Sequence, residues 1–316
     1  PLDIEDPKHP VKKSMELGPR DRLSQAFIKE REKEKTIPGP FGDVVHLDIR
    51  HLGKKKIDKK LPFVRELTKN YVGIDPVYEP IPVRPVVHYM MGGIDTNIDC
   101  STILPGLFAA GECACVSING ANRLGSNSLT EILVYGARAG QAAAVFAAEH
   151  SEINLEALEK QGADEYKRIT RDFLQKDGGS ERIATLRKEM HQVMEQSVDI
   201  FRSESGLKEA CNKIEELKDR FSSILIEDKS LNFNTELTSA LELENMIDVA
   251  ESIIFSALSR RESRGSHQRT DFVNRDDENF LRHSLAYRTE AESRIEYQDV
   301  VITKWPPAER IYGKEE

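Results

Sequence analysis

The sequence has few cysteines and no long apolar run. Its 316 residues include four cysteines, none of them in a C-x-x-C pair. We therefore expect reduced thiols in a cytosolic compartment, with neither a disulfide framework nor a metal site. No segment approaches the roughly 18 consecutive apolar residues of a membrane-spanning helix, and no secretory signal is evident. The G-x-G-x-x-G fingerprint of dinucleotide-binding folds is also absent.

The composition is that of a soluble globular protein. Hydrophobic residues make up 39% and charged residues 31%, with a net charge of -9. This acidic balance argues against nucleic acid as a partner, and the Lys54–Lys60 cluster is expected to be a solvated loop. The length predicts two or three structural units. Because the chain starts at Pro1 without a methionine, we expect it to be part of a longer protein.

Changes in pattern along the chain suggest four regions, 1–85, 86–150, 151–261 and 262–316. The first is mixed and ends in a proline-rich stretch, Pro76–Pro85, which predicts an extended crossing without regular structure. The second has short apolar strands and glycine turns. The third is helical, and three or four of its helices are expected to form an antiparallel bundle. The last is expected to hold a pair of strands.

Apolar spacing predicts the individual elements. Helices are expected over 23–33, 61–71, 128–149, 155–176, 181–201, 205–225 and 235–261, and strands over 44–49, 105–112, 283–287 and 294–303.

The stretch Gly120–Leu129 places one arginine, Arg123, among glycine, asparagine and serine residues. Small residues at this density present the backbone for a close approach. The helix that follows is expected to begin with Asn-Ser capping and to carry Gly136 and Gly140 on one face. Free amides and the positive end of the helix dipole favour an anionic or electron-rich group there. A capped, tightly packed helix without a ligand is the alternative.

Three further stretches carry candidate chemistry, each with a plain alternative. Pro105–Glu112 is a short apolar run that ends in Gly-Glu, where a carboxylate can bind a ribose, although a simple strand end is at least as good an explanation. His88 follows an apolar run before two glycines, where a histidine is more often a core residue. Arg20 and Asp21 lie at a helix start, where such a pair is normally a capping ion pair.

Together these stretches resemble the flavoprotein subunit of fumarate reductase and, nearly as closely, that of succinate dehydrogenase. The motifs that carry the resemblance run in order along the chain: 15–27, 88–94, 106–112, 120–129, 262–269, 275–280 and 306–312. The Gly-Pro-Arg-Asp, Gly-Ser-Asn-Ser-Leu and Pro-Pro-Ala forms favour fumarate reductase. L-Aspartate oxidase, which shares the Ser-Arg-Gly-x-His pattern, is a weaker match.

The resemblance implies a multi-domain α+β fold. Its parts would be the end of a substrate-capping domain, the C-terminal part of an FAD-binding α/β domain, an antiparallel helical bundle and a small C-terminal α+β domain with a hairpin. The family's glycine-rich fingerprint, its flavin-linked histidine and further substrate ligands would lie upstream of Pro1. Asn119 stands where most relatives carry histidine.

The resemblance also implies residue roles in the interconversion of fumarate and succinate with FAD. Arg20 corresponds to the proton donor, an unusual role for arginine that requires a dry site. His88 and Arg123 correspond to residues that hold the dicarboxylate, and the planar fork of Arg123 suits a carboxylate. The residues implied to contact FAD are Tyr89, Glu112, Asn127, Ser128 and Leu129.

The implied partners are the N-terminal half of the same subunit, an iron-sulfur subunit and membrane anchor subunits. The implied location is the cytoplasmic face of the inner membrane. The alternatives are succinate dehydrogenase activity and a non-catalytic fragment that serves as a docking surface for the iron-sulfur subunit.

Overall fold

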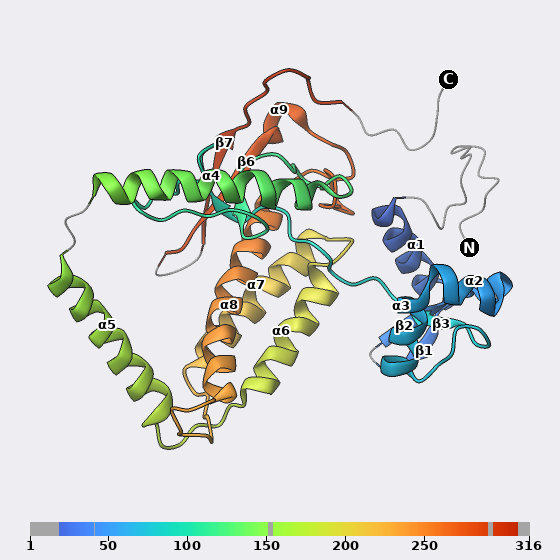
Figure 1. Ribbon diagram of the computed structural model, residues 1–316, viewed down its shortest axis with the longest axis horizontal. Coiled ribbons are helices and arrows are strands. Elements are labelled where there is room, and N and C mark those ends of the chain that lie inside the picture. Colours follow the sequence, from blue (N-terminus) through green and yellow to red (C-terminus); the bar gives the residue numbers. More distant parts are fainter. Residues whose placement is uncertain (1–18, 41, 151–153, 290–292, 309–316) are drawn as a thin grey trace. The chain divides into compact units, whose positions relative to one another are not determined.

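The structure is a computed structural model that describes residues 19–40, 42–150, 154–289 and 293–308 (Figure 1). Parts of the resemblance motifs at 15–27 and 306–312 lie outside these residues. The chain divides into two compact units. One contains the described residues up to His88 together with Pro307 and Ala308, and the other is formed by Tyr89–Pro306.

The first unit combines short helices with a small antiparallel sheet. The strands β1 (Ile37–Gly39), β2 (Gly42–Leu47) and β3 (Ile81–Val83) pair in the order β1-β2-β3. Strand β3 lies in the proline-rich stretch, so the expectation of an irregular crossing there was wrong. Pro82 is tolerated because β3 is an edge strand, where a residue without an amide hydrogen removes no bond to a second neighbouring strand.

Helices of the first unit pack around a few buried apolar residues. They are α1 (Arg20–Glu32), α2 (Gly53–Lys60) and α3 (Pro62–Leu67), the last continued by a π-helical turn at Thr68–Val72. The lysine cluster is solvated as expected, but it forms α2 and not a loop. The reason is Ile57, which is fully buried and anchors that helix.

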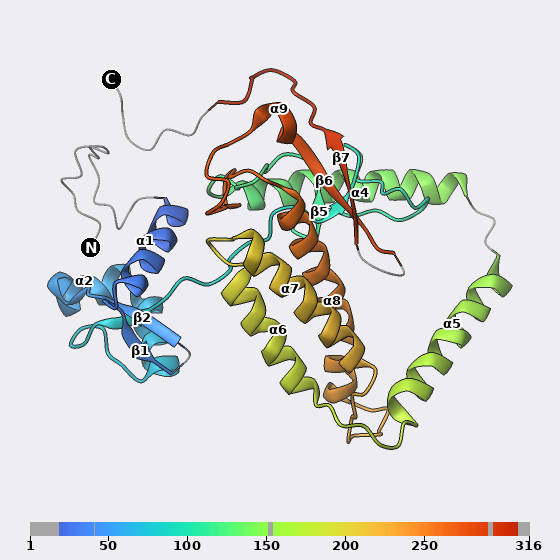
Figure 2. The same cartoon turned by 180° about the vertical axis from the view of Figure 1, so that it is seen from behind.

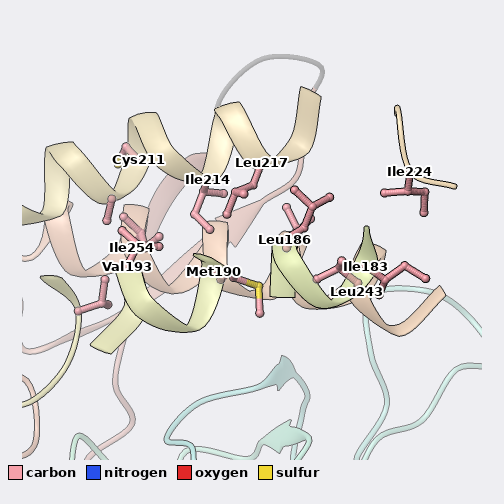
Figure 3. Close-up of a cluster of buried hydrophobic side chains, with 14 of the residues drawn as sticks. Ile183, Leu186, Met190, Val193, Cys211, Ile214, Leu217, Ile224, Leu243 and Ile254 are labelled. Carbon is pink, nitrogen blue, oxygen red and sulfur yellow. The ribbon is translucent and has the colours of Figure 1, made fainter. Parts of the chain in front are cut away.

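The second unit contains a three-helix core. Helices α6 (Ile183–Ser197), α7 (Glu204–Phe221) and α8 (Thr235–Ser259) pack against one another and lie side by side in both views (Figures 1 and 2). Their contact is made by apolar residues at helical spacing, several of which are drawn in Figure 3. Fully buried members include Leu186, Leu207, Leu217, Leu243 and Ile254.

Helix α5 (Leu155–Ile169) meets this core only at its C-terminal end. The π-helical turn at Thr170–Leu174 extends it and buries Phe173 in the core cluster. Leu155 and Leu158, in the first turn of α5, are exposed. Of the four expected bundle helices, three therefore form the bundle, and α5 contributes its end. In the described residues no helix has both the length and the apolar character to span a membrane.

The remaining elements flank this core in sequence. Helix α4 (Asn127–Glu149) follows a parallel pair of two-residue strands, β4 (Ile94–Asp95) and β5 (Ala114–Cys115). After α8, the short helix α9 (Asp277–Phe280) leads into the antiparallel hairpin β6 (Arg282–Tyr287) and β7 (Arg294–Asp299), as expected from the alternating pattern.

Residues 105–112 do not form the expected strand. Within the described residues, Phe108 makes only an isolated bridge to Ser101, and Glu112 lies in a turn before β5. A strand requires a hydrogen-bonded neighbour along its length, and in the described residues this segment has only short contacts with residues 100–102.

All four cysteines, Cys100, Cys113, Cys115 and Cys211, are free thiols. Burial is the main cause that raises the pKa of Cys100 and of Cys115. Both therefore stay protonated near neutral pH. The expected reducing compartment stays a prediction.

Candidate functional site

The candidate site in the second unit is built on a loop and the first turn of α4. The loop comprises residues 117–126 and carries Arg123. Its amide-rich sequence adopts turns, and Ser126, the residue before α4, has a left-handed backbone with φ of 66°. No side-chain hydrogen bond caps the helix, so the expected Asn-Ser capping was wrong. The left-handed conformation of Ser126 replaces the extended backbone of a side-chain cap.

Arg123 stacks on Tyr89. The guanidinium carbon lies 4.4 Å from the centroid of the Tyr89 ring, within the range of a cation–π contact. One terminal nitrogen, Nη1, donates to the carbonyl of Leu124 at 3.1 Å. The Nε of Arg123 is buried and has no partner among the described residues. The side chain is therefore held in place while one of its donors has no partner among the described residues.

Tyr89 is held in turn by a buried carboxylate that the sequence did not single out. Its hydroxyl donates to Oε2 of Glu131 at 3.0 Å, and Nδ2 of Asn119 donates to the same oxygen at 2.7 Å. Glu131 lies in the first turns of α4 and is 1% exposed. Burial, followed by the hydrogen bond to Glu131, raises the pKa of Tyr89, so its hydroxyl stays a donor near neutral pH.

The loop that carries Arg123 is also supported from the C-terminal part of the chain. Ser266 donates to the carbonyl of Ala121 through its backbone amide at 2.9 Å and its hydroxyl at 2.7 Å. Gly265 has φ of 58°, and a Cβ atom there would lie 2.6 Å from the carbonyl carbon of Ala121. Only glycine allows this close approach. The Ser-Arg-Gly-x-His motif therefore supports the candidate site.

Glu112 lies near the same group of residues. Its Oε1 accepts the backbone amide of Met90 at 3.1 Å, which ties the turn before β5 to the residue after Tyr89. The Glu112 side chain is otherwise exposed. It can therefore still accept hydrogen bonds from a polyol.

The start of α4 presents an apolar surface. Asn127 and Ser128 are half-buried, whereas Leu129 and Leu133 are 62% and 74% exposed. The positions of Gly136 and Gly140 border open space. This helix therefore has a smooth, uncovered face along several turns.

The two candidates in the first unit have different surroundings. Arg20 is exposed and is the first residue of α1, directly after Pro19. His88 is exposed at the end of an irregular segment, so the alternative of a buried core histidine was wrong. The structure brings Tyr89, Glu112 and Arg123 together within the second unit, and it describes Arg20 and His88 separately from them.

Comparison with known proteins identifies the family. Residues 8–129 match the FAD binding domain, and residues 187–312 match the fumarate reductase flavoprotein C-terminal domain. The fumarate reductase flavoprotein subunit of Mycobacterium tuberculosis is 55% identical over 309 residues, covering 96% of this chain and 53% of that protein. The chain belongs to the fumarate reductase and succinate dehydrogenase flavoprotein family.

Two further relatives separate the branches of this family. A solved Escherichia coli quinol-fumarate reductase aligns with a TM-score of 0.90 at 50% identity, covering 96% of this chain and 52% of that one. The succinate dehydrogenase flavoprotein subunit of Rickettsia bellii is 36% identical, covering 94% of this chain and 52% of that protein. The chain thus resembles the fumarate reductases more closely. It spans about half the length of these relatives.

The site has unpaired polar groups that suit a cofactor or substrate. Besides Nε of Arg123, Oδ1 of Asn119 is buried without a partner in the described part of the chain. One is a donor and the other an acceptor, and buried polar groups are rarely left unpaired. Together with the uncovered start of α4, they fit a flat, polar-edged ligand such as FAD in this half of the fold.

Proposed function

We propose that this chain is part of the flavoprotein subunit of a fumarate reductase. Arg123 supports the proposal most directly, because a guanidinium is held by stacking while its buried Nε lacks a partner. That arrangement suits one carboxylate of a dicarboxylic acid. The higher identity to fumarate reductases than to succinate dehydrogenase favours reduction of fumarate.

Some residues of this chain would bind the substrate, and others would transfer a proton to it. Arg123 and His88 hold the carboxylates of fumarate, which strains the double bond and stabilises the charge that develops on the dicarboxylate. When bound and reduced, FAD would supply a hydride to one alkene carbon and would itself be oxidised. Arg20 delivers a proton to the other carbon, completing succinate, and Asp21 helps to return a proton to Arg20.

Five residues would hold FAD. Glu112 has the free oxygen needed to bind a ribose hydroxyl. The first turn of α4 supplies the positive end of the helix dipole, which favours the electron-rich edge of a flavin. The proposed contacts are Tyr89, Glu112, Asn127, Ser128 and Leu129.

The proposal includes partners and location. The N-terminal half of the subunit would complete the flavin site, and an iron-sulfur subunit would carry electrons between the flavin and membrane anchor subunits that use a quinone. The complex would lie at the cytoplasmic face of the inner membrane, with this subunit peripheral. The relatives are themselves named as flavoprotein subunits, which supports the existence of partner subunits.

The direct test is a dye-linked assay on the full-length subunit. Fumarate reduction with a reduced viologen should be faster than succinate oxidation with an oxidised dye under matched conditions. The reverse ratio would favour the second candidate, succinate dehydrogenase, which the 36% identity to the Rickettsia protein supports. A colourless but folded sample of this chain alone, with no activity in either direction, would be the behaviour of a docking fragment that needs the missing half.

A further inference from the structure

We propose that Glu131 is a positioning residue for the dicarboxylate site. Its buried carboxylate fixes the Tyr89 ring on which Arg123 stacks and sets the orientation of the Asn119 amide. The inference rests on the proposed function, because it assigns a role in holding the substrate that Arg123 binds.

Glu131 lies where the loss of hydration makes a carboxylate energetically unfavourable. It is 1% exposed, and no salt bridge to it occurs in the described ranges. A buried carboxylate needs hydrogen bonds to offset the loss of water. Both of its donors, the Tyr89 hydroxyl and the Asn119 amide, reach the same oxygen, Oε2. Burying a carboxyl group with only two neutral donors is less favourable than burying an apolar side chain of the same size. We infer that Glu131 serves to orient these two donors, Tyr89 and Asn119.

The first consequence concerns Arg123. A tyrosine side chain can swing and tilt unless its hydroxyl is held, and here Oε2 of Glu131 accepts from that hydroxyl at 3.0 Å. The guanidinium of Arg123 lies over the face of the same ring, with its carbon 4.4 Å from the ring centroid. Because the raised pKa of Tyr89 keeps its hydroxyl protonated, this hydroxyl still donates to Glu131 at neutral pH. Glu131 thus acts on the substrate-binding arginine without touching it.

The second consequence concerns Asn119. The amide of asparagine can be turned end for end, and an oxygen that accepts a hydrogen bond selects its nitrogen. The Nδ2 group must therefore face Glu131, and Oδ1 must face the other way. That oxygen is buried and has no partner in the described part of the chain. Glu131 therefore determines that the unpaired polar atom of Asn119 is an acceptor and not a donor.

Two variants of equal length separate positioning from simple packing. Glu131→Gln keeps an oxygen that can accept from Tyr89 and Asn119, whereas Glu131→Met keeps the volume and removes the acceptors. In the full-length protein with its flavin bound, we expect Glu131→Met to raise the fumarate Kd about tenfold. Glu131→Gln should restore most of that loss, to within about threefold of wild type.

The fumarate Kd is read from the perturbation of the flavin spectrum, with flavin content and Tm measured on the same samples. A packing role would lower Tm in the Met variant and leave the fumarate Kd unchanged. That result would overturn the proposal, as would equal weakening of fumarate binding by Gln and Met.

A second pair of variants keeps the test decisive when Glu131→Met fails to fold. Tyr89→Phe retains the ring beneath Arg123 but frees it from Glu131, and we expect a two- to fivefold rise in the fumarate Kd. Tyr135→Phe, on the same helix α4, is the matched control and should bind like wild type. Equal Kd values for both variants would contradict the proposal.

The failure of this inference is distinguishable from failure of the proposed function. If wild type itself neither binds nor reduces fumarate, the function is wrong. If wild type does both and the Glu131 and Tyr89 variants bind fumarate normally, only the positioning role is wrong.

Discussion

The guanidinium of Arg123 lies over the ring of Tyr89, with its carbon 4.4 Å from the ring centroid. The contact joins the loop before α4 to the start of the same compact unit, so two residues 34 positions apart share one surface. A flat guanidinium on an aromatic face is held in orientation as well as in position. This orientation underlies the first prediction.

Arg123→Lys should keep flavin and lose most dicarboxylate binding in the full-length protein. Lysine retains the charge but loses both the planar fork and the stacking on Tyr89. We expect the fumarate Kd to rise at least tenfold, measured by the flavin spectral change. Arg138→Lys is the matched control, because Arg138 lies on α4 in an exposed ion pair with Asp99. A fumarate Kd within twofold of wild type for Arg123→Lys would remove Arg123 from the substrate site.

Arg20→Gln should abolish turnover while fumarate still binds. Glutamine is polar but cannot act as the acid in the reaction, and a positioned acid contributes roughly 10²–10⁴-fold to a rate. Steady-state kcat and the fumarate Kd are compared with those of Lys29→Gln, which removes an exposed charge from the same helix α1. Activity above about a hundredth of wild type would show that another group donates the proton.

Gly265→Ala should both destabilise the protein and weaken fumarate binding. A Cβ atom would lie 2.6 Å from the carbonyl carbon of Ala121, in a left-handed backbone that alanine adopts poorly. We expect a loss of about 1–3 kcal/mol in the free energy of unfolding. Because Ala121 belongs to the loop that carries Arg123, the fumarate Kd should rise as well.

Gly162→Ala is the control for this substitution. Gly162 lies within α5, next to open space, and alanine there should be neutral or stabilising by roughly 0.5–1 kcal/mol. If Gly265→Ala matches this control in both measurements, the contact with Ala121 does not support the loop.

His267 should make stability depend on pH between about 4 and 6.5. Its Nδ1 is 2.8 Å from Nη1 of Arg202 and its Nε2 is 3.1 Å from the carbonyl of Arg260, so the neutral ring accepts from one and donates to the other. Burial, and then the charge of Arg202, lowers the pKa of His267 to about 4. The unfolded state binds the proton near pH 6.5 and the folded state only near pH 4.

The stabilising contribution of neutral His267 is therefore complete above about pH 6.5 and is lost as the pH falls toward 4, up to about 3 kcal/mol in total. Urea unfolding across this range measures it. His267→Gln should flatten the dependence in that window, and His191→Gln, an exposed substitution on α6, should not. An unchanged slope in His267→Gln would show that other groups cause the acid sensitivity.

The sequence predicted the helices well, because their burial is periodic and local. Leu186, Met190 and Val193 recur on one face of α6, and that pattern is visible without the structure. The strand expected over 105–112 failed for the opposite reason. A strand is stabilised by a neighbour elsewhere in the chain, which its own pattern cannot supply.

The candidate site divides in the same way. Arg123 stands out because small and amide residues surround it in sequence. Glu131 does not, because its burial depends on Asn119, 12 residues away, and on Tyr89, 42 residues away. One signal was available: a single carboxylate between apolar residues of a helix. Read alone, that signal also fits a solvent-exposed position.

We propose that fumarate is bound at Arg123 and reduced by flavin in the protein that contains this chain. Rapid mixing of the photoreduced full-length protein with fumarate under anaerobic conditions tests it most directly. We expect the flavin absorbance to return in a fumarate-dependent phase, with one succinate formed per flavin, and this phase to be nearly lost at the same fumarate concentration in Arg123→Lys. Flavin that stays reduced in wild type at saturating fumarate, or that reoxidises equally fast in Arg123→Lys, would contradict the claim.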